Sequence, residues 1–351
     1  MRIFCILAGI HPTLPNDEIL GILKSSDISY SVIEKVDNCL ILDLEDNGYR
    51  EIINRAAFCK GVYTLLFKCN LDFNSIKTAI NDMEMTFQEP RVYSFSVRIE
   101  KIKKMHKNLS HSLSSVQLES YIGALVLTKF KNNLKVDLVS PELKFKGIIV
   151  NGSLIFGIEL HKSNSKEFYE RSGPNRPYFH PCGMDAKFAR LMVNLAEIKS
   201  GAVIYDPHCG IGSILIEAGI LNYHVIGSDI SWKMIHASKI NLNYYKISNF
   251  MIFRADSQIL PIKKIDNIIT DPPYGRSSPL KSSSIFKLYK NFLSQCKDII
   301  YNNNKIVFAT PNIYGNYIEE ILKKMDFIIV RKYDYYIHRS LIRNLWIIRV
   351  K

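Results

Sequence analysis

Hydrophobic and polar residues follow a regular strand-and-helix pattern over the last 150 residues of the chain. Short apolar runs predict strands at residues 202–206, 224–229, 249–256, 265–271, 305–310, 328–335 and 344–350. Helical spacing lies between them at residues 212–221, 231–245, 284–296 and 315–325. This alternation predicts an α/β fold with a Rossmann-like, seven-stranded, mostly parallel sheet. The last two strands have no long helix between them, which predicts that the final strand is inserted antiparallel.

The first 162 residues show a different pattern of strand-like and helix-like segments. This pattern predicts an α+β region that precedes the sheet. Residues 1–68 alternate three strand-like runs with two helix-like ones and form a first unit. Residues 69–162 form a second unit with a strand at 92–99, a helix at about 114–129 and a pair of strands that flank Asn151-Gly152. That dipeptide is a strong hairpin signal, because both residues tolerate a positive φ.

A segment rich in serine, glycine, asparagine and proline separates this region from the sheet. We therefore expect residues 163–180 to be a linker. The domain that contains the sheet then spans residues 181–351 and opens with a helix at 185–199.

The segment Asp271-Pro272-Pro273-Tyr274-Gly275 directly follows one of the predicted strands. Proline cannot continue a central strand, so the chain must turn outward at this point. It does so at the carboxyl end of the sheet, where ligands of open α/β folds bind. The segment therefore brings a carboxylate, a rigid backbone and an aromatic ring to the mouth of the sheet.

These groups suit the methylation of an exocyclic amine on a flat heterocyclic base. Such an amine is a poor nucleophile, because its lone pair is delocalised into the ring. The Asp271 carboxylate and the Pro272 carbonyl could hold the amine and favour the positive charge that develops on it. The Tyr274 ring could stack on the base. A proline-rich turn without chemistry is the alternative interpretation.

Carboxylates and glycines also stand at the ends of the other predicted strands. The loop D-P-H-C-G-I-G after the first strand combines Asp206 with Gly210 and Gly212, and glycines there permit a tight turn and a close approach of the backbone to a ligand. Asp229 ends the second strand, where a ribose diol would be held, and Asp256 ends the third, where it could accept from an adenine amine. Since the loop is not G-x-G-x-x-G, a dinucleotide is disfavoured. The set predicts S-adenosylmethionine as the cofactor and an amino group as the acceptor.

The composition and charge of the chain indicate where the protein resides in the cell and what kind of partner it binds. No apolar stretch reaches membrane-spanning length, and the seven cysteines contain no C-x-x-C pair, so we expect a soluble cytoplasmic protein without a zinc site. The formal charge of +13 is unevenly distributed, with −5 in residues 1–90, +7 in residues 91–146 and +11 in residues 163–351. The basic middle, which includes Lys101, Lys103, Lys104 and Lys107, predicts a module that docks on RNA phosphates. A solvated basic surface is the alternative.

Several motifs together resemble the archaeal tRNA (guanine(10)-N2)-methyltransferase family, which includes dimethyltransferases and combines a THUMP domain with a Rossmann-fold methyltransferase. They are the segments 176–181, 189–196, 206–212, 271–278 and 338–341, which read R-P-Y-F-H-P, A-R-L-M-V-N-L-A, D-P-H-C-G-I-G, D-P-P-Y-G-R-S-S and H-R-S-L. Over residues 1–162 the resemblance rests on domain order. The cofactor loop departs from the usual family form at His208, where Phe is common, and at Ile211, where a small or hydroxyl residue is common.

The resemblance implies a ferredoxin-like unit over residues 1–68, a THUMP domain over residues 69–162 and a partner, tRNA, that the THUMP domain engages at its acceptor end. It implies one and then a second methyl transfer to N2 of guanosine 10, with Asp271 and the Pro272 carbonyl on the amine and Tyr274 stacked on the base. The target base must leave its helix to be methylated. The loop 277–284 is expected either to close over that base or to serve only as a connector.

Three questions stay open at this point. The same D-P-P-Y motif fits an amino methyltransferase that acts on another tRNA or ribosomal RNA guanosine, or on adenine N6. A non-catalytic RNA-binding protein that keeps the fold is a rival from another class. The oligomeric state is also open, between a protein that needs a small activating protein partner and a monomer without one.

Overall fold

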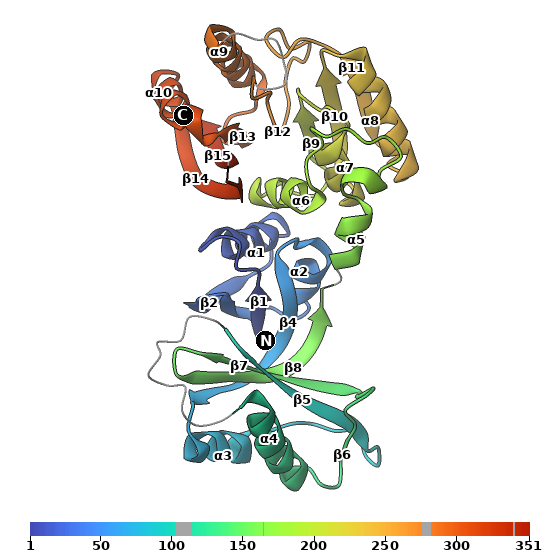
Figure 1. The fold of residues 1–351 in the computed structure, drawn as a ribbon, viewed down its shortest axis with the longest axis vertical. Helices are drawn as coiled ribbons and strands as arrows, with labels where there is room; N and C mark the ends of the chain where they lie inside the picture. The colour runs from blue at the N-terminus through green and yellow to red at the C-terminus, as the bar shows by residue number, and fades with distance from the viewer. Residues whose placement is uncertain (103–113, 164, 276–281, 340) are drawn as a thin grey trace. The chain divides into compact units, whose positions relative to one another are not determined.

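The computed structural model describes residues 1–102, 114–163, 165–275, 282–339 and 341–351. The chain divides into two compact units (Figure 1). The first comprises Met1–Pro12, Ser29–Ile53 and Cys59–Ser163, and the second comprises Thr13–Ile28, Asn54–Phe58 and Asn164–Lys351. Several residues singled out in the sequence lie outside the described residues. They are Lys103, Lys104 and Lys107, residues 276–281 after the D-P-P-Y-G segment, and Ser340.

The first unit is built on an eight-stranded sheet with the order β2-β3-β1-β4-β8-β7-β5-β6. The strands are β1 (Arg2–Leu7), β2 (Tyr30–Val36), β3 (Cys39–Leu44), β4 (Cys59–Asn70), β5 (Tyr93–Lys101), β6 (Leu134–Val136), β7 (Leu143–Val150) and β8 (Ser153–Lys162). The short helix α2 (Tyr49–Arg55) lies between β3 and β4. Strand β2 was not anticipated from the sequence. The long strand β4 pairs with both β1 and β8, so one sheet continues across residue 68, the boundary expected between the first two segments.

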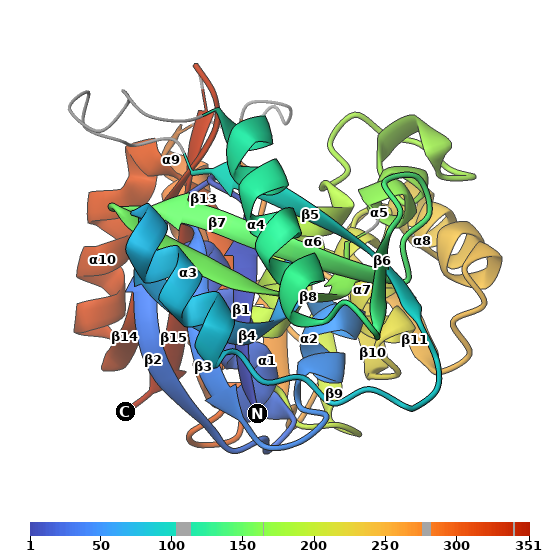
Figure 2. The same ribbon diagram turned by 90° about the horizontal axis from the view of Figure 1, so that it is seen from below.

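Two helices cover one face of this sheet, α3 (Phe73–Asp82) and α4 (Ser115–Lys129), as Figures 1 and 2 both show. Helix α4 begins where the sequence predicted, because the Ser114 side chain and Gln117 form a reciprocal capping box. Apolar side chains of both helices pack with those of β5, β7 and β8 into one buried core. The predicted hairpin between β7 and β8 is confirmed, with φ values of 47° at Asn151 and 75° at Gly152.

Many cations of the basic segment are paired with acids within the first unit. Lys146 lies 2.8 Å from Glu100, Lys144 lies 3.3 Å from Glu159, and Arg98 lies 3.6 Å from Glu119. These exposed or half-exposed pairs each contribute about 0–1 kcal/mol to stability. Their larger effect is to neutralise part of the local positive charge.

The second unit is built on a seven-stranded sheet with the order β11-β10-β9-β12-β13-β15-β14. The strands are β9 (Val203–Asp206), β10 (His224–Asp229), β11 (Phe250–Arg254), β12 (Asn267–Thr270), β13 (Ile306–Pro311), β14 (Phe327–His338) and β15 (Leu341–Val350). All seven strands expected from the sequence are present. Strand β15 runs antiparallel between β13 and β14, which confirms the predicted insertion of the final strand.

Helices cover both faces of this sheet. Helices α9 (Ser282–Ile299) and α10 (Gly315–Lys324) bury their apolar sides on one face, in a core that includes the fully buried Trp346. Ile226 of β10 packs toward this core, whereas the adjacent Gly227 meets Leu215 of α7 (Ser213–Ile220) on the opposite face. Helices α6 (Ala186–Leu195) and α8 (Trp232–Tyr244) pack beside α7. None of the helices in the described ranges is both long and apolar enough to cross a membrane.

An early segment of the chain belongs to this second unit. Helix α1 (Leu14–Ser25) packs against α6, and its Glu18 is completely buried. The Glu18 carboxylate accepts hydrogen bonds from the backbone N–H of Ala57 and Phe58, at 2.8 and 3.0 Å, and from Nδ2 of Asn194 at 2.9 Å. Burial raises the pKa of Glu18. Three segments that are distant in sequence therefore meet on one carboxylate.

Residues 163–180, expected as a linker, include the helix α5 (Ser165–Glu170) and a turn of 3-10 helix (Gly173–Asn175). Arg176 of the R-P-Y-F-H-P motif is buried rather than exposed. Its Nη2 donates to the Met184 carbonyl at 3.0 Å, its Nε to the Arg171 carbonyl at 2.6 Å, and its Nη1 to the Ser213 hydroxyl. This arginine thus fixes the segment onto the start of α7.

Candidate active site

The loop after β9 forms one wall of the candidate site. Gly210 and Gly212 have φ values of 51° and 85°, a region that side-chain-bearing residues rarely adopt. A Cβ atom at Gly212 would also lie 2.7 Å from the Ser238 hydroxyl oxygen, so that position excludes any side chain. Helix α7 starts at Ser213, and its first N–H groups therefore face the loop. The glycine signal in the sequence correctly marked this tight turn.

Asp229 ties the next strand end to this loop. Its Oδ2 accepts from the Gly210 N–H at 3.1 Å, and its Oδ1 accepts from the Ser231 N–H at 2.8 Å. Burial raises the pKa of Asp229, and these two hydrogen bonds oppose the increase. Each oxygen keeps a free lone pair, so the carboxylate can still accept from a hydroxyl of a ligand. Asp256, two residues after β11, accepts from the Gln258 N–H at 2.9 Å.

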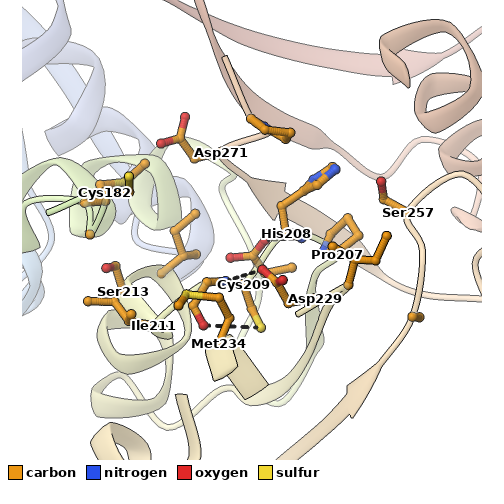
Figure 3. Close-up of a pocket in the computed structure, with 18 of the residues that line it drawn as sticks. Cys182, Pro207, His208, Cys209, Ile211, Ser213, Asp229, Met234, Ser257 and Asp271 are labelled. Carbon is orange, nitrogen blue, oxygen red and sulfur yellow. Dashed lines mark hydrogen bonds between the residues drawn. The ribbon is translucent and has the colours of Figure 1, made fainter. Parts of the chain in front are cut away.

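A cavity of about 440 Å³ lies at the carboxyl ends of these strands (Figure 3). Its volume falls in the usual range for a site that binds a small molecule or cofactor. Its lining includes five of the eight residues predicted from the sequence: Asp206, Gly210, Asp229, Asp256 and Asp271. The other three, Gly212, Pro272 and Tyr274, lie next to lining residues in the chain but do not line it themselves. Figure 3 shows Asp229, His208 and Asp271 around this space.

Asp206 is the most buried of the predicted carboxylates. It accepts from the Thr270 hydroxyl at 2.6 Å and from the His208 N–H at 3.1 Å. Burial raises its pKa to about 7, and the nearby carboxylates Asp271 and Asp229 act in the same direction. Near neutral pH this group is therefore divided between its charged and neutral forms.

His208 is half-buried beside Asp206. Its Nδ1 lies 3.1 Å from the Thr270 hydroxyl oxygen, and its ring contacts Phe292 edge-on at a centroid distance of 5.0 Å. Burial lowers its pKa to about 3, so the ring is neutral at physiological pH. A neutral ring in an apolar contact suits His208 to the wall of the cavity, which it lines.

The D-P-P-Y segment follows β12, and its two polar side chains contact each other. The Tyr274 hydroxyl donates to Oδ1 of Asp271, while Oδ2 of Asp271 lies 3.6 Å from Nη2 of Arg343. Pro272 is buried, and the Pro273 carbonyl accepts from the Tyr289 hydroxyl at 3.2 Å. Burial raises the pKa of Asp271, and the Arg343 charge opposes this change. The carboxylate is thus held between a phenol and a guanidinium.

Sequence reasoning missed two residues of this arrangement, Arg343 and Thr270. Arg343 is separated from Asp271 by more than seventy residues and carries no motif of its own. The only usable signal was the expected insertion of the last strand, which brings the start of β15 to the carboxyl edge of β13. In that register Arg343 pairs with Pro311, the last residue of β13. Thr270 is the last residue of β12, and its hydroxyl bridges Asp206 and His208.

Comparison with known proteins agrees with this geometry. Residues 174–333 match the family model described as RMKL-like, methyltransferase domain. A tRNA (guanine(10)-N2)-dimethyltransferase of Methanothermobacter thermautotrophicus is 33% identical over 349 residues, which cover 99% of this chain and 99% of that protein. A tRNA (guanine(10)-N2)-dimethyltransferase of Methanocaldococcus jannaschii is 30% identical over 361 residues, covering 97% of both.

A solved structure shares the fold over the whole length. TrmN from Thermus thermophilus superimposes with a TM-score of 0.60 at 16% identity, and the match covers 100% of both chains. The methyltransferase domain and the full-length relatives point to one assignment. The chain belongs to the tRNA (guanine(10)-N2)-dimethyltransferase family.

Proposed function

We propose that the protein is a tRNA methyltransferase that uses S-adenosylmethionine and places one and then a second methyl group on N2 of guanosine 10. The single observation that carries this proposal is the position of Asp271 in the wall of the cavity that the glycine loop, Asp229 and Asp256 also line. A carboxylate suited to an amine and a set of groups suited to a nucleoside therefore face one space. The family of the chain supplies the substrate class.

The residues around the cavity fit S-adenosylmethionine. Free lone pairs on Asp229 suit a ribose diol, and Asp256 suits the adenine amine. The loop with Gly210 and the N-terminus of α7 suit the methionine carboxylate, because backbone N–H groups there have no helical partner. We propose that Asp206, which also lines the cavity, balances the positive charge of the cofactor. The cofactor supplies an electrophilic methyl group on a sulfonium.

The chain itself contributes positioning of the amine and stabilisation of its developing charge. Asp271 and the Pro272 carbonyl accept from the two N2 hydrogens, which directs the nitrogen lone pair at the methyl group. The nitrogen becomes positive as it attacks and then loses a proton to Asp271 or to water, so no strong general base is needed. Tyr274 stacks on the base in this proposal. Its hydroxyl bond to Asp271 must then be shared or exchanged when the amine binds.

Within the first unit we propose a ferredoxin-like part and a THUMP domain that engages the acceptor end of tRNA. The order of segments and the family support this division. Among the described residues, Lys131 and Lys135 are our candidates for contacts with RNA phosphates, while Lys103, Lys104 and Lys107 lie outside the described residues. We place the enzyme in the cytoplasm, because its seven cysteines are all free.

The direct test is methylation of an unmodified tRNA transcript with S-adenosylmethionine, followed by digestion and mass spectrometry of the nucleosides. We expect N2-methylguanosine first and N2,N2-dimethylguanosine later, both in the fragment that contains position 10. A methylated adenosine, or N2-methylguanosine at another position, would contradict the target. Cofactor binding without turnover would favour either a missing activating protein partner or the non-catalytic alternative, and addition of cell extract separates these two.

Cofactor affinity should depend on pH through Asp206. Because the pKa of Asp206 is raised to about 7, this carboxyl group is protonated in the free protein below that pH. Binding of the cationic cofactor would displace that proton. Affinity for S-adenosylmethionine should therefore weaken as pH falls, by about tenfold between pH 8 and pH 6. Isothermal titration calorimetry at both pH values measures this change. The variant Asp206→Asn should bind more weakly at pH 8 and lose the dependence, and an unchanged slope in that variant would refute the assignment to Asp206.

A further inference from the structure

Arg343 lies at the same edge of the sheet as Asp271, at the start of the inserted strand β15. It pairs with Pro311 at the end of β13 on one side and with Tyr335 of β14 on the other. The neighbouring strand β12 ends one residue before Asp271. The two side chains approach to 3.6 Å between Nη2 and Oδ2. The sheet topology therefore places a guanidinium beside the carboxylate that is proposed to hold the amine.

Two aromatic rings flank the guanidinium of Arg343. The Arg343 guanidinium carbon lies 5.4 Å from the centroid of Phe188 and 5.5 Å from the centroid of Tyr274. Phe188 is itself stacked on Tyr335 at 4.7 Å. Only 15% of the Arg343 side chain is exposed. Packing thus fixes the plane of the guanidinium before any substrate binds.

The donors of Arg343 are incompletely used in this arrangement. Its Nε is buried and has no hydrogen-bond partner among the residues that the structure describes. The contact with Asp271 is an ion pair at 3.6 Å, longer than a hydrogen bond. Arginine carries five N–H donors, and a buried donor without an acceptor is unfavourable. Arg343 therefore keeps N–H donors beside Asp271 that could donate to an acceptor on a bound base.

Guanine carries the complementary pattern. Its N2 amine is a donor, and its O6 carbonyl, further along the same edge, is an acceptor. Adenine carries an amine donor where guanine has O6, so it would set a donor against the guanidinium. Arginine is the side chain that most often reads guanine, through its O6 and N7 acceptors. Given the proposed function, on which this inference rests, we propose that Arg343 selects guanine by donating to O6 while Asp271 accepts from N2.

A second role for Arg343 would be only to keep Asp271 charged. The two roles make different predictions for a base that has the amine but not the carbonyl. If Arg343 acts only through Asp271, its loss slows transfer to every base with an N2 amine by the same factor. If it reads O6, its loss slows transfer to guanine but not to 2-aminopurine, which has the amine and lacks O6.

The test uses two tRNAs with guanosine or 2-aminopurine at the target position. It compares kcat/KM of the wild type, Arg343→Met and Arg343→Lys on each. Arg343→Met should lose about 10- to 100-fold more on guanosine than on 2-aminopurine. The variant-to-wild-type ratio is taken for each base, so intrinsic reactivity cancels. Arg343→Lys keeps the charge but not the planar fork, so it should leave the 2-aminopurine rate at the wild-type level and restore the guanosine rate only in part.

Matched controls keep the outcome interpretable. Arg349→Met changes an arginine six residues further along β15, on the same side of the strand by the period of two, and should leave both rates unchanged. Affinity for S-adenosylmethionine reports that each variant is folded. Equal loss on both bases in Arg343→Met would overturn the inference alone. Failure of the wild type to methylate guanosine N2 would overturn the proposed function, and this inference with it.

Discussion

Replacing Asp271 by alanine should abolish methyl transfer and leave affinity for S-adenosylmethionine nearly intact. Asp271 is the only carboxylate of the D-P-P-Y segment, and the charge that develops on the amine has no other carboxylate assigned to it. Removal of one preorganised electrostatic contact typically lowers kcat by roughly 100- to 1000-fold. The loss here should be at least that large, because the variant also leaves Arg343 without its ion-pair partner. Single-turnover methylation of tRNA measures the rate, and calorimetry measures the affinity.

The reciprocal control for this prediction is Asp229→Ala, which should lose cofactor affinity first. Asp229 holds the glycine loop through the Gly210 N–H, so its removal affects the proposed cofactor side of the cavity. Asp271→Asn supplies a second variant of the same size in case alanine perturbs folding. If Asp271→Ala loses affinity and activity in parallel, the proposed division of roles between Asp271 and the cofactor residues is wrong.

The variant Glu217→Gln should strongly destabilise the second unit. Glu217 of α7 is completely buried and pairs with two arginines, at 2.8 Å to Nε of Arg171 and 2.8 Å to Nη2 of Arg190. Arg190 is itself only 2% exposed. Removing the carboxylate charge leaves a buried guanidinium without a counterion, and such a change typically costs about 3–5 kcal/mol. That loss is a large fraction of the stability of an average domain.

Tryptophan fluorescence gives a direct readout for this second prediction. The chain contains two tryptophans, Trp232 and Trp346, and both belong to the second unit. Urea denaturation followed by this signal should show a lower midpoint in Glu217→Gln. The matched control is Glu320→Gln, which removes a carboxylate from an exposed pair with Lys324 on α10 and should leave the midpoint nearly unchanged. A wild-type midpoint in Glu217→Gln would show that the buried cluster adds little to stability.

The two predictions probe different aspects of the same sheet. Glu217 lies on α7, whose N-terminus follows the glycine loop, and Arg176 reaches the same helix start at Ser213. The ion cluster and Arg176 thus hold the helix that carries the loop. Asp271 directly follows strand β12, and Arg343 lies on strand β15. Stability and chemistry are therefore expected to separate experimentally, since the variants of one set leave the contacts of the other in place.

The sequence by itself determined the elements whose signals are local. The strands of the second unit, the antiparallel last strand, the helix that begins near residue 114 and the Asn151-Gly152 turn all follow from spacing or from the φ values that a residue allows. The candidate carboxylates were found for the same reason. Each follows a predicted strand, and the carboxyl ends of parallel strands meet at one edge of a sheet. The resemblance then named the family that the full-length relatives bear out.

Only the tertiary structure decided the contacts between segments that are far apart in the chain. It placed helix α1 in the second unit, where buried Glu18 joins α6 to the backbone at Ala57 and Phe58. It also brought Arg343 to Asp271 and directed the Tyr274 hydroxyl onto that carboxylate. The physical reason is that periodicity reports which side of an element is buried, but not which distant element covers it. That choice depends on packing and on the pairing of buried charges, which emerge only when the whole chain has folded.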